Sequence, residues 1–353
     1  MHLSNNIIVF LELLKVGLWG NGNPDIRKDG TTDWNEIYQL AQEQSVQGLV
    51  LAGLEYSDVK PPQALLLQWI GEVQIIEQRN KEMNAFIADL IEKLRIYDIY
   101  AILVKGQGIA RCYEKPLWRS SGDVDLLLSD NNFENARELL QTFSSVIMPY
   151  ERYSRHLGMN IDSWLVEIHG TLRTGLSGRV DKVVDEVQKD VFYGGNVRSW
   201  NDGKTTVFLP APDNDVFFVF SHFLMHFYRE GMNLRQICDW CRLLWTYRES
   251  LDYGKLELWI NKAGLVKECK TFYNLASRYL GMPDLNSRFM FHDSRFDKKA
   301  EKLMEFILGG YSGSQFKDTL HIAKIFPWKA LRYSPSIFLI VNWMKVKERI
   351  FKR

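Results

Sequence analysis

The chain has 353 residues, of which 46% are hydrophobic and 25% are charged, as is ordinary for a globular protein. Its 44 basic residues nearly balance its 43 acidic ones, which excludes the global positive field of a dedicated nucleic-acid surface, so any phosphate recognition must be local. Few cysteines, no signal-peptide pattern at the N-terminus and no apolar stretch long enough to cross a bilayer predict a reducing, cytoplasmic location.

Residues 1–95 are predicted to be helical and to serve as a packing region. Thr32-Asp33 is typical of a helix N-cap. After Pro61-Pro62, apolar residues recur with helical period from about Gln63 to Arg95, which predicts one long helix. This region contains no residue pattern that indicates chemistry.

From Tyr100 the pattern changes to short strand-like runs, and after Pro212 it becomes helical again. The predicted strands are 100–104, 124–128, 146–152, 157–161 and 164–169, with short helices at 108–113 and 130–143 and a hairpin over 197–209 that turns at Asn201-Asp202-Gly203. The expected fold is α+β: a small mixed sheet within residues 96–212, flanked by helical regions at 1–95 and 213–353.

Two aspartates alternate in the apolar run that forms the second strand. Asp123 and Asp125 are two residues apart, so their side chains project from the same face of the strand. Two carboxylates this close in an apolar setting are unfavourable unless a cation neutralises them, and a hard divalent ion such as Mg²⁺ prefers oxygen ligands. The alternative is a solvated strand end. Gly106 and Gly108 form a flexible turn at the start of the short helix that precedes this strand. A glycine turn in this position favours the interpretation as a phosphate-binding metal site.

These elements together resemble the nucleotidyltransferases with a DNA-polymerase-β-like fold. One branch is especially similar: the poorly characterised bacterial nucleotidyltransferase family often found with surface-polysaccharide biosynthesis. The resemblance covers about residues 95–245 and is carried by Lys105-Gly106, Pro116, Arg119, Gly122-Asp123-Val124-Asp125-Leu126-Leu127, Val166-Glu167-Ile168-His169, His222, His226, Leu234-Arg235 and Asp239. It implies transfer of a nucleotidyl group from an NTP such as ATP to an acceptor, with Mg²⁺ or Mn²⁺.

The resemblance also implies a third carboxylate on a later strand, and Glu167 is the best match. Its neighbours are apolar, so an unpaired Glu would be costly to bury, although a solvated Glu on an edge strand is the alternative. His169 shares the face of Glu167 and is a candidate to contact a phosphate or orient a carboxylate, with a structural histidine equally open.

Several basic and turn residues are candidates for binding the nucleotide. Lys105 and Arg119 are expected to contact phosphate, with Arg119 alternatively paired to the carboxylates. The Gly106-Gln107 turn is expected to offer backbone amides. The wider superfamily favours Gly-Ser in this turn, so Gln107 is a departure. Arg235 pairs most simply with Asp239 four residues later, and the resemblance implies that it flanks the cleft.

Three other patterns have simpler interpretations. His222 and His226 have zinc-ligand spacing on a helix, but no third ligand is evident, and Cys238 and Cys241 are best interpreted as buried helical cysteines. The basic, aromatic C-terminus from Lys324 to Arg353 packs on the domain or contacts an anionic membrane. The alternative function is a nucleotide-binding or partner-binding protein that keeps the fold with little catalysis.

Overall fold

The computed structural model describes residues 3–26, 32–153, 155–201, 205–229, 231–285, 293–312 and 314–333. The N-terminal helices are α1 (Asn5–Trp19), α2 (Trp34–Glu43), α3 (Gln47–Glu55) and α4 (Gln63–Ile96). The central elements are β1 (Ala101–Val104), α5 (Gly106–Ala110), η1 (Pro116–Trp118), β2 (Asp123–Leu128), α6 (Asp130–Gln141), β3 (Val146–Ile147), β4 (His156–Ile161), β5 (Trp164–His169), α7 (Gly178–Tyr193), β6 (Arg198–Asn201) and β7 (Thr206–Leu209). The helices α8 (Pro212–Arg229), α9 (Leu234–Thr246), α10 (Tyr253–Ala263), α11 (Val266–Tyr279), α12 (Asp297–Leu308), α13 (Gln315–Ala323) and α14 (Pro327–Tyr333) follow, with η2 (Ser294–Phe296) before α12.

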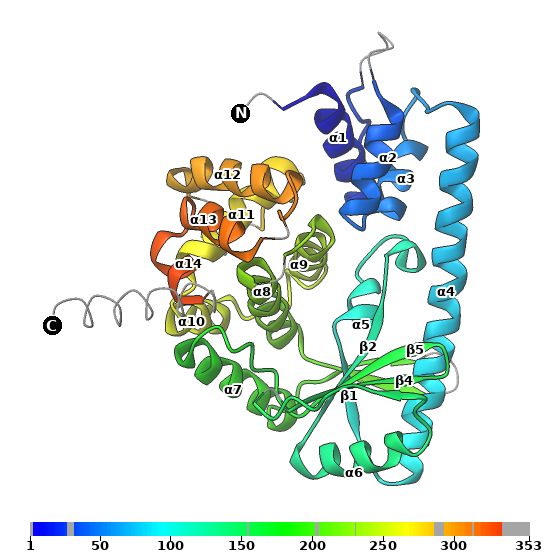
Figure 1. The fold of residues 1–353 in the computed structure, drawn as a ribbon, viewed down its shortest axis with the longest axis vertical. Helices are drawn as coiled ribbons and strands as arrows, with labels where there is room; N and C mark the ends of the chain where they lie inside the picture. Colours follow the sequence, from blue (N-terminus) through cyan, green and yellow to red (C-terminus); the bar gives the residue numbers. More distant parts are fainter. Residues whose placement is uncertain are drawn as a thin grey trace, which may run out of the picture.

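The strands form one seven-stranded mixed sheet in the order β3-β4-β5-β2-β1-β7-β6. β2 lies at its centre, antiparallel to β1 and parallel to β5. The outer pairs β4–β5 and β6–β7 are antiparallel hairpins. The α+β class predicted from the sequence is therefore confirmed, with a mixed sheet and helices before and after it (Figure 1).

The two faces of the sheet have different partners because side chains alternate along each strand. Val124, Leu126 and Leu128 of β2 belong to a hydrophobic core with α6 and the C-terminal half of α4. The intervening positions of β2, including Asp123 and Asp125, face the opposite side, toward α8. This alternation leaves one face of the sheet free for polar chemistry, because the other face provides the apolar packing.

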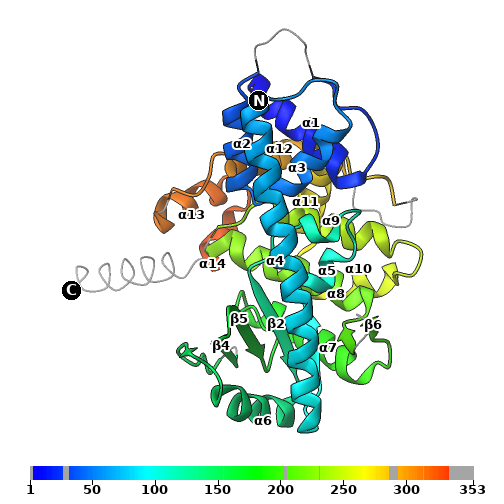
Figure 2. The same cartoon turned by 90° about the vertical axis from the view of Figure 1, so that its right-hand side faces the viewer.

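The helix α4 connects distant parts of the molecule. It extends from the N-terminal helices down to the sheet and α6 (Figures 1 and 2). At its beginning Trp69 is fully buried in a core shared by α1–α3 and the helices from α8 onward, and Leu90 and Leu94 near its end pack in the core under the sheet. The indole of Trp19 in α1 also donates a 2.6 Å hydrogen bond to the carbonyl of Leu280.

Most element predictions are confirmed, with small differences at the ends. Asp33 caps α2 by accepting from the backbone N–H groups of Asn35 and Glu36. The prediction of a strand over 146–152 is wrong beyond Ile147, where the continuous pairing with β4 ends at the exposed edge of the sheet. Beyond this point Glu151 forms an isolated bridge with His156. The predicted turn residues Asp202 and Gly203, and most of the basic C-terminus, lie outside the described residues. No described helix combines the length and the apolar character that a bilayer crossing requires.

The contact between α1 and α3 depends on glycines. A Cβ atom at Gly53 would lie 2.0 Å from the carbonyl oxygen of Leu13, whereas a Cβ atom at Gly71 in α4 meets nothing within 4 Å. We therefore predict that Gly53→Ala lowers the free energy of unfolding by ~1–3 kcal/mol or more, through overpacking. The control Gly71→Ala should raise it by about 0.5–1 kcal/mol, because alanine is the better helix former. Denaturant unfolding measures both changes, and equal effects would contradict this packing.

Candidate functional site

Carboxylates from two parallel strands converge on the α8 side of the sheet. Asp125 on β2 lies directly beside Glu167 on β5, and Asp123 follows on the same face. Oxygen atoms of all three carboxylates lie within 4.8 Å of one another. The family resemblance implies this juxtaposition, although about 40 residues separate Glu167 from the pair. In this arrangement the three carboxylates can together coordinate one divalent cation.

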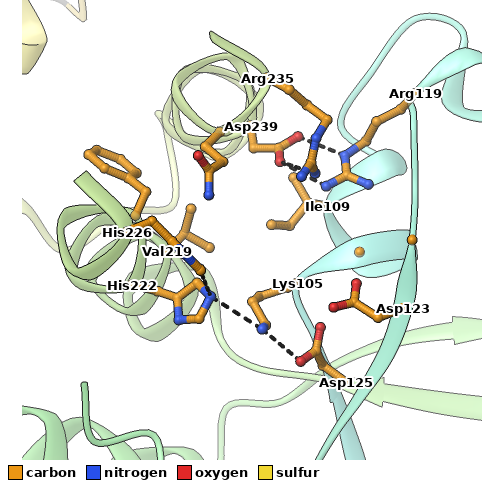
Figure 3. A pocket seen from close by; sticks show the side chains of 14 residues that line it. Lys105, Ile109, Arg119, Asp123, Asp125, Val219, His222, His226, Arg235 and Asp239 are labelled. Atoms are coloured by element: carbon orange, nitrogen blue, oxygen red, sulfur yellow. Dashed lines mark hydrogen bonds and ion pairs between the residues drawn. The ribbon is translucent and has the colours of Figure 1, made fainter. Parts of the chain in front are cut away.

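Lys105 provides the positive charge next to this cluster. Its Nζ lies 2.6 Å from Oδ1 of Asp125 and 3.3 Å from Nε2 of His222 on α8 (Figure 3). Burial lowers the pKa of Lys105, but the carboxylates outweigh it and raise the pKa above its ordinary value. Lys105 and Gly106 both have positive φ, 58° and 40°, so the chain turns sharply at the end of β1. A lysine in this region is strained, and the ion pair with Asp125 offsets the strain.

Two histidines contact the carboxylates from the other side. Nε2 of His169 lies 2.8 Å from Oδ1 of Asp125, and Nε2 of His156 lies 3.1 Å from Oε2 of Glu167. The two imidazole rings are stacked with centroids 4.8 Å apart. His156 was not among the residues predicted from the sequence. The signal was present, since Ile161 pairs with Trp164 across a two-residue connection, and counting back along the hairpin places His156 opposite His169.

The three carboxylates differ in their protonation because their neighbours differ. Repulsion from Asp125, together with burial, raises the pKa of Asp123. Burial also favours the neutral form of Asp125, yet Lys105 and His169 outweigh it and hold its pKa well below the usual range. For Glu167 the contact with His156 likewise outweighs burial and lowers the pKa. Asp123 is therefore the least compensated carboxylate of the cluster.

A second network of charges forms the opposite wall of the cleft. The guanidinium of Arg119 binds the carboxylate of Asp239 on α9 through two hydrogen bonds of 2.7 and 2.8 Å (Figure 3). The hydroxyl of Tyr113 donates to the same carboxylate at 2.7 Å. The interpretation in which Arg119 pairs with the Asp123–Asp125 cluster is therefore wrong. Arg235 makes the expected contact with Asp239, but only at 3.5 Å, and about a quarter of its side chain is exposed.

The side chain of Gln107 points away from the cleft and into the protein. Its amide donates a 2.8 Å hydrogen bond to Asn80 of α4, and Asn80 in turn donates to the carbonyls of Leu117 and Arg119. Of the Gly106-Gln107 turn, only backbone groups remain available to a ligand. The amide of Gln107 instead connects α4, α5 and the segment before β2.

The paired histidines of α8 lie next to the carboxylate cluster and do not complete a metal site of their own. Nε2 of His222 and Nε2 of His226 are 3.1 Å apart. Burial and the neighbouring Lys105 hold the pKa of His222 well below its usual range, so the neutral ring can accept a hydrogen bond from Lys105. Among the described residues, neither group of three potential metal ligands includes either histidine. Cys238 and Cys241 are buried free thiols on α9, as expected.

The cleft beside the carboxylates has two chambers with volumes of about 220 and 360 Å³. Lys105, Asp123, His222 and His226 line both chambers. The smaller one, here called the turn chamber, is also lined by Gly106, Arg119, Gly122, Asp125, Arg235 and Asp239. The larger one, here called the histidine chamber, is also lined by Glu151, His156, Glu167, His169, Thr171 and Arg173. The carboxylate cluster therefore lies at the junction of two separate binding spaces.

Arg119–Asp239 and Arg173–Asp185 are both bidentate ion pairs, but the first is buried and the second is exposed to solvent. We predict that Arg119→Gln lowers the free energy of unfolding by ~3–5 kcal/mol, because it leaves the Asp239 carboxylate buried without its main partner. Arg173→Gln should cost at most about 1 kcal/mol, since water replaces the lost partner. Urea unfolding of both variants tests the difference, and a cost below about 1 kcal/mol for Arg119→Gln would contradict a structural role.

Comparisons with known proteins found a solved structure and a family model that match the chain. A solved structure, an antigenic nucleotidyltransferase-like protein from Paracoccidioides brasiliensis, aligns at 15% identity over 60% of this chain and 97% of its own, with a TM-score of 0.35. A similarity this distant carries no argument about the site. No curated protein matches the chain. The model of an uncharacterised nucleotidyltransferase family matches residues 30–281, a segment that includes every site residue described above. The chain therefore belongs to this uncharacterised nucleotidyltransferase family.

Proposed function

We propose that the protein transfers a nucleotidyl group from an NTP to an acceptor, with Mg²⁺ or Mn²⁺ bound by Asp123, Asp125 and Glu167. The observation that carries the proposal is the convergence of these carboxylates, whose oxygens lie within 4.8 Å of one another, at the junction of two chambers. Family membership supports the same class of reaction.

The residues present fit a divalent cation. Three carboxylates at this distance repel one another, as the raised pKa of Asp123 indicates, and Lys105 contributes a single positive charge. Carboxylate oxygens are the ligands that Mg²⁺ and Mn²⁺ prefer. Such an ion would supply Lewis-acid stabilisation of the charge that develops on the phosphate oxygens.

We assign the NTP to the turn chamber and the acceptor to the histidine chamber. The turn chamber contains Arg235, whose single 3.5 Å contact leaves most of its hydrogen-bonding capacity for a phosphate. Lys105 and Gly106 line this chamber, and we assign Lys105 and the backbone N–H groups of Gly106 and Gln107 to the triphosphate. Arg119, whose guanidinium is held by Asp239 and by the neighbouring Ser120 and Ser121, acts by positioning Asp239 and through it Arg235.

The reaction requires an in-line displacement at the α-phosphorus. A bond forms between the acceptor oxygen and the α-phosphorus, and the bond from the α-phosphorus to the oxygen bridging to the β-phosphate breaks. Pyrophosphate leaves with that electron pair. The proton of the acceptor passes to a carboxylate at the junction, and Glu167 is best placed because it lines the acceptor side. His169 orients Asp125 through its 2.8 Å contact.

One observation favours a second candidate, a nucleotide-binding or partner-binding protein without catalysis. Nζ of Lys105 lies 2.6 Å from Oδ1 of Asp125 and so already neutralises one of the carboxylates that would bind a metal. One assay distinguishes the two candidates: the chain is incubated with each α-labelled NTP, Mg²⁺ or Mn²⁺ and cell extract, and labelled products are sought.

The acceptor is a sugar phosphate, a small molecule or a protein side chain, and surface-polysaccharide metabolism is the pathway that we would test first.

Replacing either aspartate should lower the transfer activity to a similar extent, but the two replacements should change the stability of the protein differently. We predict that Asp123→Asn and Asp125→Asn each lower NTP transfer at least ~100-fold, since each removes a charge that a catalytic cation needs. Without added metal, Asp123→Asn should unfold at the same or higher temperature, because it relieves repulsion. Asp125→Asn should unfold at a lower temperature, because it leaves Lys105 buried without its 2.6 Å partner. Thermal unfolding and the labelled-NTP assay measure both effects, and full activity in either variant would place the chemistry elsewhere.

Substitution of Glu167 should lower the catalytic rate more than the affinity for the nucleotide. Glu167→Gln keeps the side-chain volume and removes the one carboxylate of the cluster that lines the histidine chamber but not the turn chamber. We predict a kcat at least about tenfold lower with little change in the affinity for NTP, because its contact is made to the attacking group. Arg235→Gln provides the opposite pattern, a higher KM for the NTP. If Glu167→Gln weakened NTP affinity as strongly as kcat, the assignment of the two chambers would be wrong.

A further inference from the structure

A second group of potential metal ligands lies beside the carboxylate cluster. His156 on β4 and His169 and Glu167 on β5 place one donor atom each within 4.8 Å of the other two. The two strands are hydrogen-bonded neighbours, with His156 paired directly opposite His169. The group therefore rests on rigid sheet scaffolding and not on a loop.

We propose that His156, His169 and Glu167 bind a second divalent ion, a first-row transition metal such as Co²⁺ or Zn²⁺, on the acceptor side of the cleft. The inference deepens the proposed function, on which it rests, because Glu167 belongs to both groups of potential ligands.

The distances between the donor atoms suit a single ion. Oε2 of Glu167 lies 3.1 Å from Nε2 of His156 and 3.8 Å from Nε2 of His169. Ligands bound at ~2.1 Å with tetrahedral angles lie roughly 3.4 Å from one another, so small side-chain rotations would close the site. Nε2 of His169 would exchange its 2.8 Å contact with Asp125 for the ion. The stacked rings, with centroids 4.8 Å apart, direct both Nε2 atoms toward the same carboxylate oxygen.

An unsatisfied nitrogen provides independent support. Nε2 of His156 is buried, and its 3.1 Å contact with Glu167 lacks the geometry of a hydrogen bond. Within the described ranges, its polar contact is with this carboxylate alone, the same contact that lowers the pKa of Glu167. Buried polar atoms in native proteins are nearly always satisfied, and a bound metal would satisfy this one.

The ligand types decide the kind of metal. Two imidazoles and one carboxylate favour Zn²⁺, Co²⁺ and similar ions over Mg²⁺, which prefers oxygen ligands alone. The three residues line the 360 Å³ histidine chamber, so the remaining coordination positions face open space. Sites that keep open positions are typical of catalytic metals, and the ion here would polarise the hydroxyl of an acceptor.

Retention of Co²⁺ in excess Mg²⁺ tests the proposal without any nucleotide. The full chain is equilibrated with Co²⁺ and excess Mg²⁺ and desalted, and bound cobalt is measured by elemental analysis and by its visible absorption. We expect one Co²⁺ per chain in the wild type and in Asp123→Asn. His156→Gln should weaken Co²⁺ binding at least tenfold, and His169→Gln, on the neighbouring strand, should do the same. Circular dichroism checks that the variants are folded.

His226→Gln is the matched control, because it removes an imidazole from the same cleft but not from this group. It should retain its Co²⁺. Loss of cobalt in His226→Gln but not in His156→Gln, or no retained cobalt in the wild type, would overturn the proposal. Transfer that depends on Mg²⁺ in a chain that retains no cobalt would leave the proposed function intact. If the protein retains cobalt in a way that depends on His156 but shows no nucleotidyl transfer, the result would support this metal site and reject the proposed function.

Discussion

The ion pair between Lys105 and Asp125 is the interaction on which the rest of the site depends. Three carboxylates cannot share a buried position unless positive charge balances them, and Lys105 contacts the most buried of the three at 2.6 Å. The position of Nζ follows from the backbone, since Lys105 and Gly106 both adopt positive φ at the end of β1. The strained turn and the charge cluster therefore stabilise each other, and a change in either one alters both.

The walls of the cleft are fixed by two buried polar networks. Asp239 of α9 binds Arg119 and Tyr113, which joins the C-terminal helices to the segment before β2. Gln107 and Asn80 join that same segment to α4. Each group in these networks has partners at hydrogen-bond distance, so the networks specify one geometry and not several. Gln107, a departure from the superfamily pattern, thus has a structural use that leaves the backbone of the turn unobstructed.

The two chambers are lined by different groups, and the proposed function gives each of them one task of nucleotidyl transfer. On the side of the turn, Arg235 is a cation with spare hydrogen-bonding capacity. On the other side, Glu167 and two stacked imidazoles line the larger space. Asp123 lines both chambers and is the carboxylate whose charge is least compensated. The chemistry is therefore expected at this residue, and the identity of the acceptor depends on what the histidine chamber can accommodate.

The sequence by itself determined the local parts of this site. The period of two along β2 places Asp123 and Asp125 on one face, and the same period relates Glu167 to His169, because alternation is a property of a single strand. Only the tertiary structure decided which strands are neighbours. The register of β2 with β5 brings Glu167 to Asp125, packing of α9 on the sheet domain gives Arg119 its partner Asp239, and burial against α4 turns Gln107 inward. These contacts join residues 27 to 120 positions apart, and no local pattern encodes them because they depend on how separate elements pack.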